Sequence, residues 1–369
     1  MFNLIRSFSV SLALLVLLLT PAFAQDDGGG SKPEKLFDTV ETLEISMTAP
    51  WHELVGDKDF TGSYPANLVY TDDSGNEVSI DLTVERRGVT RQRVCKIPPI
   101  KLRFVKGAAK GTLFRGQKSL KMVTHCQKNA DFQQYYILEM LAYRIYNLLT
   151  DYSFKVRPLT VTYYQANAEE QDSGLSFFKK ETSAGPVFAF LIEDDKDVAN
   201  RFDLNKLNVP RIKASQLASG ETALLGLYQY MISNVDWAAT RGPQPDECCH
   251  NIKLIGPEPI RPEDTVYAIP YDFDSSGLVD AKYASPNQNL PITRVTQRLY
   301  RGYCISNPGL EDARQDMLEK EQAIYDLVKA ESRLTSRSQK KALRFLEGYF
   351  DIIRDDKKFS REIVKECRG

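Results

Sequence analysis

The first half of the chain alternates apolar and polar residues with a period of two, a pattern typical of half-buried strands. Residues 43–47 show this alternation clearly. Residues 67–70 and 78–84 also predict strands, and the hexamer Thr-Asp-Asp-Ser-Gly-Asn at 71–76 separates them. Because these are turn-forming residues, we expect a β-hairpin here. Further strands are predicted at residues 100–104, 119–123, 159–164 and 187–192.

Helical patterns interrupt and then replace the strands. Asp131 is a suitable N-cap for a long helix that extends to about residue 149 and carries an apolar stripe. After about residue 200 the pattern is helical, with helices expected at residues 215–233, 312–330 and 336–353. This order predicts an α+β fold with a β-rich first part that contains one long helix, residues 41–195, and a mostly helical second part, residues 196–369.

The N-terminus has the pattern of a secretory signal peptide. Arg6 precedes an uncharged run at residues 10–19, and Ala22-Phe23-Ala24 provides a small-x-small cleavage pattern. The run is shorter than the roughly 20 residues that a membrane-spanning helix needs. We therefore expect residues 1–24 to be a signal peptide and residues 25–40 a flexible leader. The mature chain, without a transmembrane segment, is expected in the bacterial periplasm or outside the cell.

Charge is balanced overall but unevenly distributed. The chain has 48 Lys and Arg residues against 49 Asp and Glu residues, a balance that does not predict a nucleic-acid partner. Residues 86–121, however, contain twelve basic residues and no acidic residue. Within them, Lys101 and Arg103 share one face of the strand expected at 100–104. The stretch is either a solvated basic face or a region that binds phosphate.

Six cysteines permit three disulfides in an exported protein. Six cysteines allow 15 pairings. We expect Cys95 to pair with Cys126 because their segments are neighbours, and one of Cys248 and Cys249 to pair with Cys304. A bond between Cys248 and Cys249 is not expected, since vicinal geometry is unfavourable. A zinc site is not favoured, because the chain has no C-x-x-C pair and only three histidines.

Three polar clusters in the second half carry the candidate chemistry: Asn234-Val235-Asp236, His250-Asn251, and Tyr271-Asp272-Phe273-Asp274 followed by Gly277. A hairpin of two short strands, 252–255 and 266–269, would bring Asn251 close to Asp272, within reach of Asp236. Oxygen ligands of this kind suit Mg²⁺, and phosphoryl transfer needs them together with cations. The simpler interpretations are that Asp236 stabilises a turn and that the Asp272 loop binds Ca²⁺. His250 is assigned no role in proton transfer.

These residues resemble the CotH-type spore-coat kinase family over most of the mature chain. The matching segments are residues 81–88, ending in Arg87-Gly88, residues 101–104, 118–121 with the following helix to 148, 188–202 with Glu193-Asp194, and the clusters at 234–236, 250–251 and 271–277. The resemblance implies a two-lobed protein-kinase-like fold. It also implies an exported kinase that transfers phosphate from ATP, with Mg or Mn, to a protein or small secreted acceptor.

By this resemblance Asp236 is the catalytic residue, and Asn251, Asp272 and Asp274 hold the metal ion. The cofactor-binding residues would be Lys101, Arg103, Lys121, Glu139 and Glu193, with Glu139 orienting a cation. The alternative is a non-catalytic, kinase-like cell-envelope protein that binds a partner or an anionic envelope component through the basic stretch.

Overall fold

The computed structural model describes residues 35–57, 59, 61–88, 90–127, 130–166, 183–242 and 248–369. The predicted signal peptide, and the predicted leader up to residue 34, lie outside the described residues. Leu36 and Phe37, which the sequence assigned to the leader, are buried against the core of the first half. The folded part therefore includes the last residues of that predicted segment.

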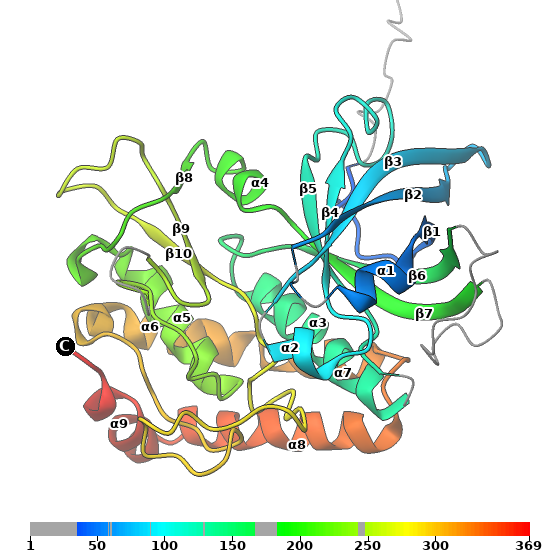
Figure 1. Cartoon of the computed structure of the whole chain (residues 1–369). Coiled ribbons are helices and arrows are strands. Elements are labelled where there is room, and N and C mark those ends of the chain that lie inside the picture. Colours follow the sequence, from blue (N-terminus) through cyan, green and yellow to red (C-terminus); the bar gives the residue numbers. More distant parts are fainter. Residues whose placement is uncertain are drawn as a thin grey trace, which may run out of the picture. The chain divides into compact units, whose positions relative to one another are not determined.

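The first half forms a closed barrel of seven strands in the order β1-β2-β3-β4-β5-β7-β6 (Figure 1). Strands β1 and β6 pair in parallel, and all other neighbours pair antiparallel. The strands are β1 Leu43–Ala49, β2 Ser63–Thr71, β3 Glu77–Arg86, β4 Ile100–Phe104, β5 Ser119–Val123, β6 Val156–Gln165 and β7 Ser183–Ile192. Helices α1 Trp51–Gly56, α2 Thr90–Val94 and α3 Ala130–Leu149 lie between strands in the sequence.

Alternation along the strands separates an apolar interior from the outer face of the barrel. On β4, Ile100 and Leu102 are fully buried inside the barrel, and Leu120 and Met122 on β5 join them. The residues between them point outward, so Lys101 lies opposite Lys121 in the β4–β5 register. The pattern that predicted the strands thus also places these lysines on the outside of the barrel.

The predicted two-lobed protein-kinase-like fold is wrong. The strands close into a mixed barrel, because β1 returns to pair with β6 over seven residue pairs, from Leu43 opposite Leu159 to Ala49 opposite Gln165. Closure leaves no sheet edge. The period of the sequence reveals which segments are strands but not which strands meet, and the family resemblance implied an architecture that the barrel contradicts.

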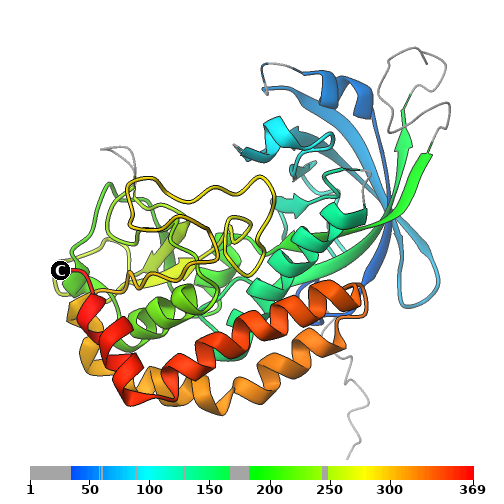
Figure 2. The same ribbon diagram turned by 90° about the horizontal axis from the view of Figure 1, so that it is seen from below.

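The second half is mostly helical and contains one small antiparallel sheet in the order β10-β9-β8. In Figure 2, α7 and α8 lie side by side, and α7 also contacts α3. No helix of the described chain is long and apolar enough to cross a membrane. The elements are α4 Asp195–Asn200, β8 Asn205–Leu207, η1 Ala214–Gln216, α5 Ser219–Met231, β9 Ile252–Gly256, β10 Tyr267–Pro270, η2 Cys304–Gly309, α6 Leu310–Glu319, α7 Glu321–Ala330, α8 Ser336–Ile353, α9 Asp356–Glu362 and η3 Val364–Glu366.

Helix α3 joins the barrel to the helical half. The outer face of β7 presents Phe188, Phe190 and Ile192 to the same core cluster that contains the apolar side of α3 and most of α5. The hydroxyl of Tyr228 on α5 donates to the backbone oxygen of Ala142 on α3 at 2.7 Å. One continuous core therefore holds α3 in place, and α3 carries two of the side chains in the site described below.

Three disulfides are present, and one was predicted correctly. Cys95 pairs with Cys126, as expected from their neighbouring segments. The expected link from Cys248 or Cys249 to Cys304 is wrong. These two cysteines pair with each other, and Cys304 pairs with Cys367. The segments of Cys304 and Cys367 are far apart in the sequence, and the backbone bridge between Tyr303 and Arg368 joins them in the fold. Proximity along the chain could not predict this pairing.

Candidate functional site

The three polar clusters of the second half converge through short backbone links. The backbone N–H groups of Gly277 and Leu278 donate to the oxygens of Ser233 and Ile232, at 3.1 and 3.0 Å. A Cβ atom at Gly277 would lie 2.7 Å from Cβ of Ser233, so only glycine allows this close approach. The Asp272 loop is thereby fixed against the segment that leads into Asp236.

Asp236 is held by the second cluster. Its Oδ1 lies 2.8 Å from Nε2 of His250, and Nδ2 of Asn251 donates to both its backbone oxygen, at 2.8 Å, and its Oδ2, at 3.1 Å. A two-way backbone bridge between Ala238 and His250 sets this register. The side chain of Asp236 nevertheless stays 46 % exposed. The carboxylate is oriented by protein donors and remains accessible.

The backbone at Asn251 and Asp272 is in the left-handed region, with φ of 50° and 64°. Asn and Asp tolerate this region better than other non-glycine residues, but it is sparsely populated and concentrates at functional sites. The backbone N–H of Asp272 donates to the hydroxyl of Tyr143, a fully buried residue of α3, at 2.9 Å. The backbone oxygen of Asn251 accepts from Tyr271 N–H at 3.1 Å, which joins the two positions.

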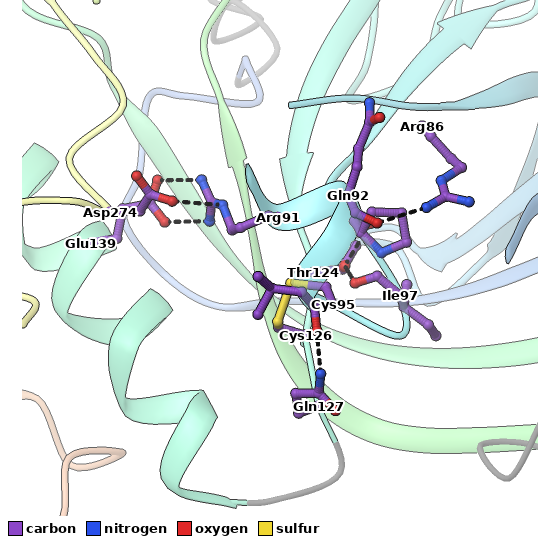
Figure 3. Close-up of a disulfide and its surroundings, with 12 residues drawn as sticks. Arg86, Arg91, Gln92, Cys95, Ile97, Thr124, Cys126, Gln127, Glu139 and Asp274 are labelled. Carbon is purple, nitrogen blue, oxygen red and sulfur yellow. Dashed lines mark hydrogen bonds and ion pairs between the residues drawn. A yellow bond between two sulfur atoms is a disulfide. The ribbon is translucent and has the colours of Figure 1, made fainter. Parts of the chain in front are cut away.

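A buried arginine binds the acidic loop to α3 (Figure 3). Arg91 on α2 makes a bidentate pair with Glu139, at 2.7 and 3.0 Å, and its Nε lies 3.1 Å from Asp274. A longer contact of 3.4 Å reaches Asp272. Arg91, Glu139 and Asp274 are all at least nine-tenths buried, whereas the side chain of Asp272 is 36 % exposed.

Negative charge exceeds positive charge in this cluster, since three carboxylates share one guanidinium. Burial would lower the pKa of Arg91, but Glu139 and the two aspartates outweigh it and hold that pKa well above the usual range. Burial raises the pKa of Glu139 to about 7 against the opposing charge of Arg91. Burial and the charge of Asp274 raise the pKa of Asp272, and Asp236 adds to the effect. A bound cation would relieve this repulsion.

Cationic side chains lie on the other side of Tyr271, the residue before Asp272. The ammonium groups of Lys121 and Lys253 lie 4.8 and 5.4 Å from the centre of its ring. Burial, together with the like charges of Arg87 and Lys253, lowers the pKa of Lys121 to about 8. A phosphate beside Lys121 and Lys253 would relieve the repulsion between these like charges and favour the charged form of Lys121.

The structure brings together some of the predicted cofactor-binding residues and separates others. Lys121 and Glu139 lie at the site, but Glu139 orients Arg91 rather than a strand lysine. Lys101 is next to Lys121 on the neighbouring strand, and Arg103 is a half-exposed partner of Glu85. Glu193 is buried with other partners, accepting from Arg201 and from the backbone of Lys155, both at 2.9 Å.

The basic stretch from residue 86 to 121 does not form one solvated face. Arg86 donates to the backbone oxygens of Val55, Asp57 and Gln92, and Arg91 is enclosed by carboxylates. Arg103 pairs with Glu85. The basic residues of this stretch therefore lie in different parts of the fold, and Arg91 is the one of these three that lies at the site.

The donor set fits Mg²⁺ or Mn²⁺ held jointly with phosphate. Among the described residues, no group of three His, Cys, Asp or Glu side chains could hold a metal ion alone. Mg²⁺, however, is usually held by one or two carboxylates with substrate phosphates. The amide oxygen of Asn251 is available because its NH₂ group donates to Asp236, and within the described chain Asp272 makes one long ion-pair contact. Asp274 is engaged by Arg91 and by the Ser275 hydroxyl.

Sequence reasoning missed several residues of the site. Arg91 was counted in the basic stretch but not distinguished, and Lys253 and Tyr271 were seen only as parts of strands or loops. His250 was named in the second cluster without a role in proton transfer. It contacts Asp236 directly, and this hydrogen bond raises the pKa of the imidazole against the effect of burial. The adjacent His-Asn pair before a strand was the available signal, because both residues direct polar atoms at one carboxylate.

Comparison of the chain with protein-family models, curated proteins and solved structures finds no match. Membership of the CotH-type family stays a prediction, and the function has to be inferred from the side chains of the site.

Proposed function

We propose that this protein is an exported phosphotransferase that moves a phosphoryl group from ATP to the hydroxyl of a protein or small secreted acceptor, with Mg²⁺ or Mn²⁺. The observation that carries the proposal is the position of Asp272. Arg91 lies 3.4 Å from its carboxylate, and the charges of Arg87 and Asp236 also act on it. A carboxylate able to hold a metal ion, a second carboxylate and a set of cations are the groups that phosphoryl transfer requires.

Asp236 is the residue that receives the proton of the acceptor hydroxyl. The hydrogen bonds from His250 and Asn251 restrict its carboxylate, and its 46 % exposure lets an acceptor approach. His250 is a positioning residue, because it acts through Asp236. Orientation of this kind contributes to catalysis by keeping the base within hydrogen-bond reach of the proton it removes.

Asn251 and Asp272 would hold the metal ion with the phosphates of ATP. Bound there, the ion would neutralise charge on the phosphates. Lys121 and Lys253, beside Tyr271, would bind the remaining phosphate oxygens. Arg91 does not reach for substrate, since Glu139 and Asp274 enclose it. Its part is to hold the Asp272 loop against α3.

The alternative of a non-catalytic, envelope-bound protein has less support. It relied on a continuous basic face, and Arg86, Arg91 and Arg103 are each engaged within the chain. A pure binding protein also has no need for Asp236 and Asp272 near each other. The lack of a kinase-like fold does not count against the proposal, because function belongs to sites that different folds can carry. Three disulfides support export to an oxidising compartment.

The experiment is to follow release of phosphate from ATP, and its transfer to the protein's own hydroxyls, with Mg²⁺ or Mn²⁺. Asp236→Asn should lower turnover by about 10²- to 10⁴-fold while ATP still binds. Asp272→Asn should abolish metal-dependent ATP binding. The matched control is Asp351→Asn, an exposed α8 carboxylate outside the site, which should behave as the wild type. The proposal fails if the wild type turns over no ATP with either ion, or if Asp236→Asn turns over ATP as the wild type does.

A further inference from the structure

A cavity of about 470 Å³ lies beside the segment that follows Asp236. Four arginines line it: Arg211, Arg241, Arg301 and Arg368. We call it the arginine pocket. Within the described part of the chain, no Asp or Glu side chain lines this cavity. Gly369, the last residue of the sequence, also lines the cavity. Four guanidinium groups, with no described Asp or Glu side chain among the lining residues, favour an anion here.

The pocket is built from fixed backbone. Arg211 and Arg241 face each other across an antiparallel bridge, and Tyr303 and Arg368 across a parallel one. The guanidinium of Arg368 lies 4.7 Å from the ring of Trp237 and 4.5 Å from that of Tyr303. The disulfide from Cys304 to Cys367 joins the same two segments. The backbone that carries Arg211, Arg241 and Arg368 is therefore fixed before any ligand arrives, and the Arg368 side chain is packed against two rings, which lowers the entropy lost on binding.

Several donors of the pocket are left without partners. Nε of Arg301, and Nε and one terminal nitrogen of Arg368, are buried and donate to no acceptor among the described residues. Burial and the like charges of Arg301 and Arg241 lower the pKa of Arg368 to about 10. Burial also lowers the pKa of Arg301. An oxyanion in the cavity would relieve the repulsion among the four arginines, and guanidinium groups match phosphate oxygens in pairs.

The pocket lies close in the chain to the candidate catalytic carboxylate. Ala238 and Thr240 line it, and Asp236 precedes Ala238 by two residues. Along an extended chain that separation is roughly 7 Å. The charge of Asp236 acts directly on Arg301. A molecule anchored in the pocket could therefore present a neighbouring hydroxyl to Asp236.

We propose that the arginine pocket binds a phosphate group carried by the acceptor, so that the acceptor of this phosphotransferase is itself a phosphorylated molecule. The anion-binding part of the inference rests on the pocket alone, and the assignment of the anion to the acceptor rests on the function proposed above. The recognised chemistry is a phosphate monoester placed a short distance from a free hydroxyl.

The first measurement is calorimetric titration of the full chain with inorganic phosphate, O-phosphoserine and serine. Phosphate and O-phosphoserine should bind, and serine should not. The double variant R211A/R241A changes two exposed arginines that, among the described residues, are joined by the backbone bridge, so the fold should be retained. It should bind both phosphate compounds at least tenfold more weakly.

The matched control is R337A/K340A, which removes two positive charges from the basic cavity on α8. This control should bind phosphate as the wild type does. Equal loss in both double variants would overturn the proposal, because it would indicate a general charge effect. Binding of phosphate without binding of O-phosphoserine would overturn the assignment to an acceptor.

The two proposals fail in different ways. K121A should lose ATP binding and keep O-phosphoserine binding, whereas R211A/R241A should do the reverse. If ATP does not bind the wild type but R211A/R241A still loses O-phosphoserine, the phosphotransferase proposal fails and the anion site stands. If ATP binds and is turned over but R211A/R241A binds O-phosphoserine normally, the anion site fails alone.

Discussion

Two groups of carboxylates in this protein have opposite surroundings. Glu139 and Asp274 are enclosed around Arg91, with less than a tenth of each residue exposed. Asp236, in contact with His250 and Asn251, keeps nearly half of its side chain exposed. The enclosed group joins α2, α3 and the Asp272 loop, which come from distant parts of the chain. The open group is made by residues that lie close in the sequence, because the backbone bridge between Ala238 and His250 brings Asn251 to Asp236.

The enclosed carboxylates support the structure, whereas the proposed chemistry belongs to the open carboxylate. A buried ion pair costs desolvation, and removing one partner leaves an uncompensated charge, so the enclosed group fixes geometry. An exposed, hydrogen-bonded carboxylate contributes little to stability and is free to meet a substrate. Asp272 is intermediate between these two groups, because it contacts Arg91 and its side chain is 36 % exposed. A carboxylate that holds a metal ion needs both a fixed position and access to the ligand.

The largest effect should follow from removing Arg91, the cation that the enclosed carboxylates share. Arg91→Met leaves Glu139, Asp272 and Asp274 without their shared cation, and we expect a loss of about 3–5 kcal/mol in the free energy of unfolding. Urea unfolding followed by circular dichroism would measure it. The control Arg103→Met breaks a half-exposed pair and should cost less than about 1 kcal/mol. Similar losses in both variants would remove the distinction between enclosed and open groups.

The next effect concerns the disulfide that fixes α2. Cys95 follows the helix that carries Arg91, and its bond to Cys126 connects that helix to the segment after β5 (Figure 3). The double change Cys95→Ser/Cys126→Ser should lower the free energy of unfolding by about 2–4 kcal/mol. Double-mutant analysis with Arg91→Met should give less than the sum of the two losses. Strict additivity would show that the disulfide does not support the enclosed group.

A smaller effect is expected in nucleotide binding as Lys121 titrates. Its pKa is lowered to about 8, so it loses its charge above pH 8, where an ordinary lysine keeps it. Affinity for ATP with Mg²⁺ should fall about tenfold, or about 1.4 kcal/mol, between pH 7 and 9.5. Lys121→Arg stays charged and should remove most of this dependence. An unchanged profile in Lys121→Arg would exclude Lys121 from phosphate binding.

The smallest effect belongs to the open group. The hydrogen bond to Asp236 raises the folded-state pKa of His250, so its contribution to stability is full below the unfolded pKa of about 6.5 and is lost as pH rises through the higher folded value. His250→Gln should therefore lower stability at pH 5.5 by less than about 1 kcal/mol and leave it unchanged at pH 9. Thermal melting at both values would measure this. A larger loss at pH 9 would contradict the assigned protonation.

Local elements could be predicted from the sequence because they depend on local pattern. The hairpin of β2 and β3 was expected from a turn-rich hexamer, and the helix predicted at 336–353 coincides with α8. The helix predicted at 312–330 is two helices, α6 and α7, that meet at Lys320. Barrel closure could not be predicted, since β1 and β6 are far apart in the chain and their alternation says nothing about their partner.

The same is true of the site. Contacts between neighbouring segments could be predicted from the sequence, and contacts between distant segments could not. The hairpin argument correctly joined Asn251 to Asp272, because β9 and β10 pair directly and Tyr271 bonds to Asn251. Arg91 could not be distinguished from eleven other cations in its stretch, because its role depends on α3 and on a loop about 180 residues later in the chain. Residues whose function depends on such long-range packing carry no signal in local pattern.

The most direct test of the account is the melting temperature of the full chain with ATP and Mg²⁺ or Mn²⁺, compared with ATP and a chelator. Ligand at about 100 times its dissociation constant stabilises the folded state by about 2.7 kcal/mol, which raises the melting temperature by several degrees. We predict this metal-dependent rise in melting temperature for the wild type and for Asp236→Asn, and no such rise for Asp272→Asn. A wild type whose melting temperature does not change with ATP and either ion would contradict it, as would an equal rise in Asp272→Asn.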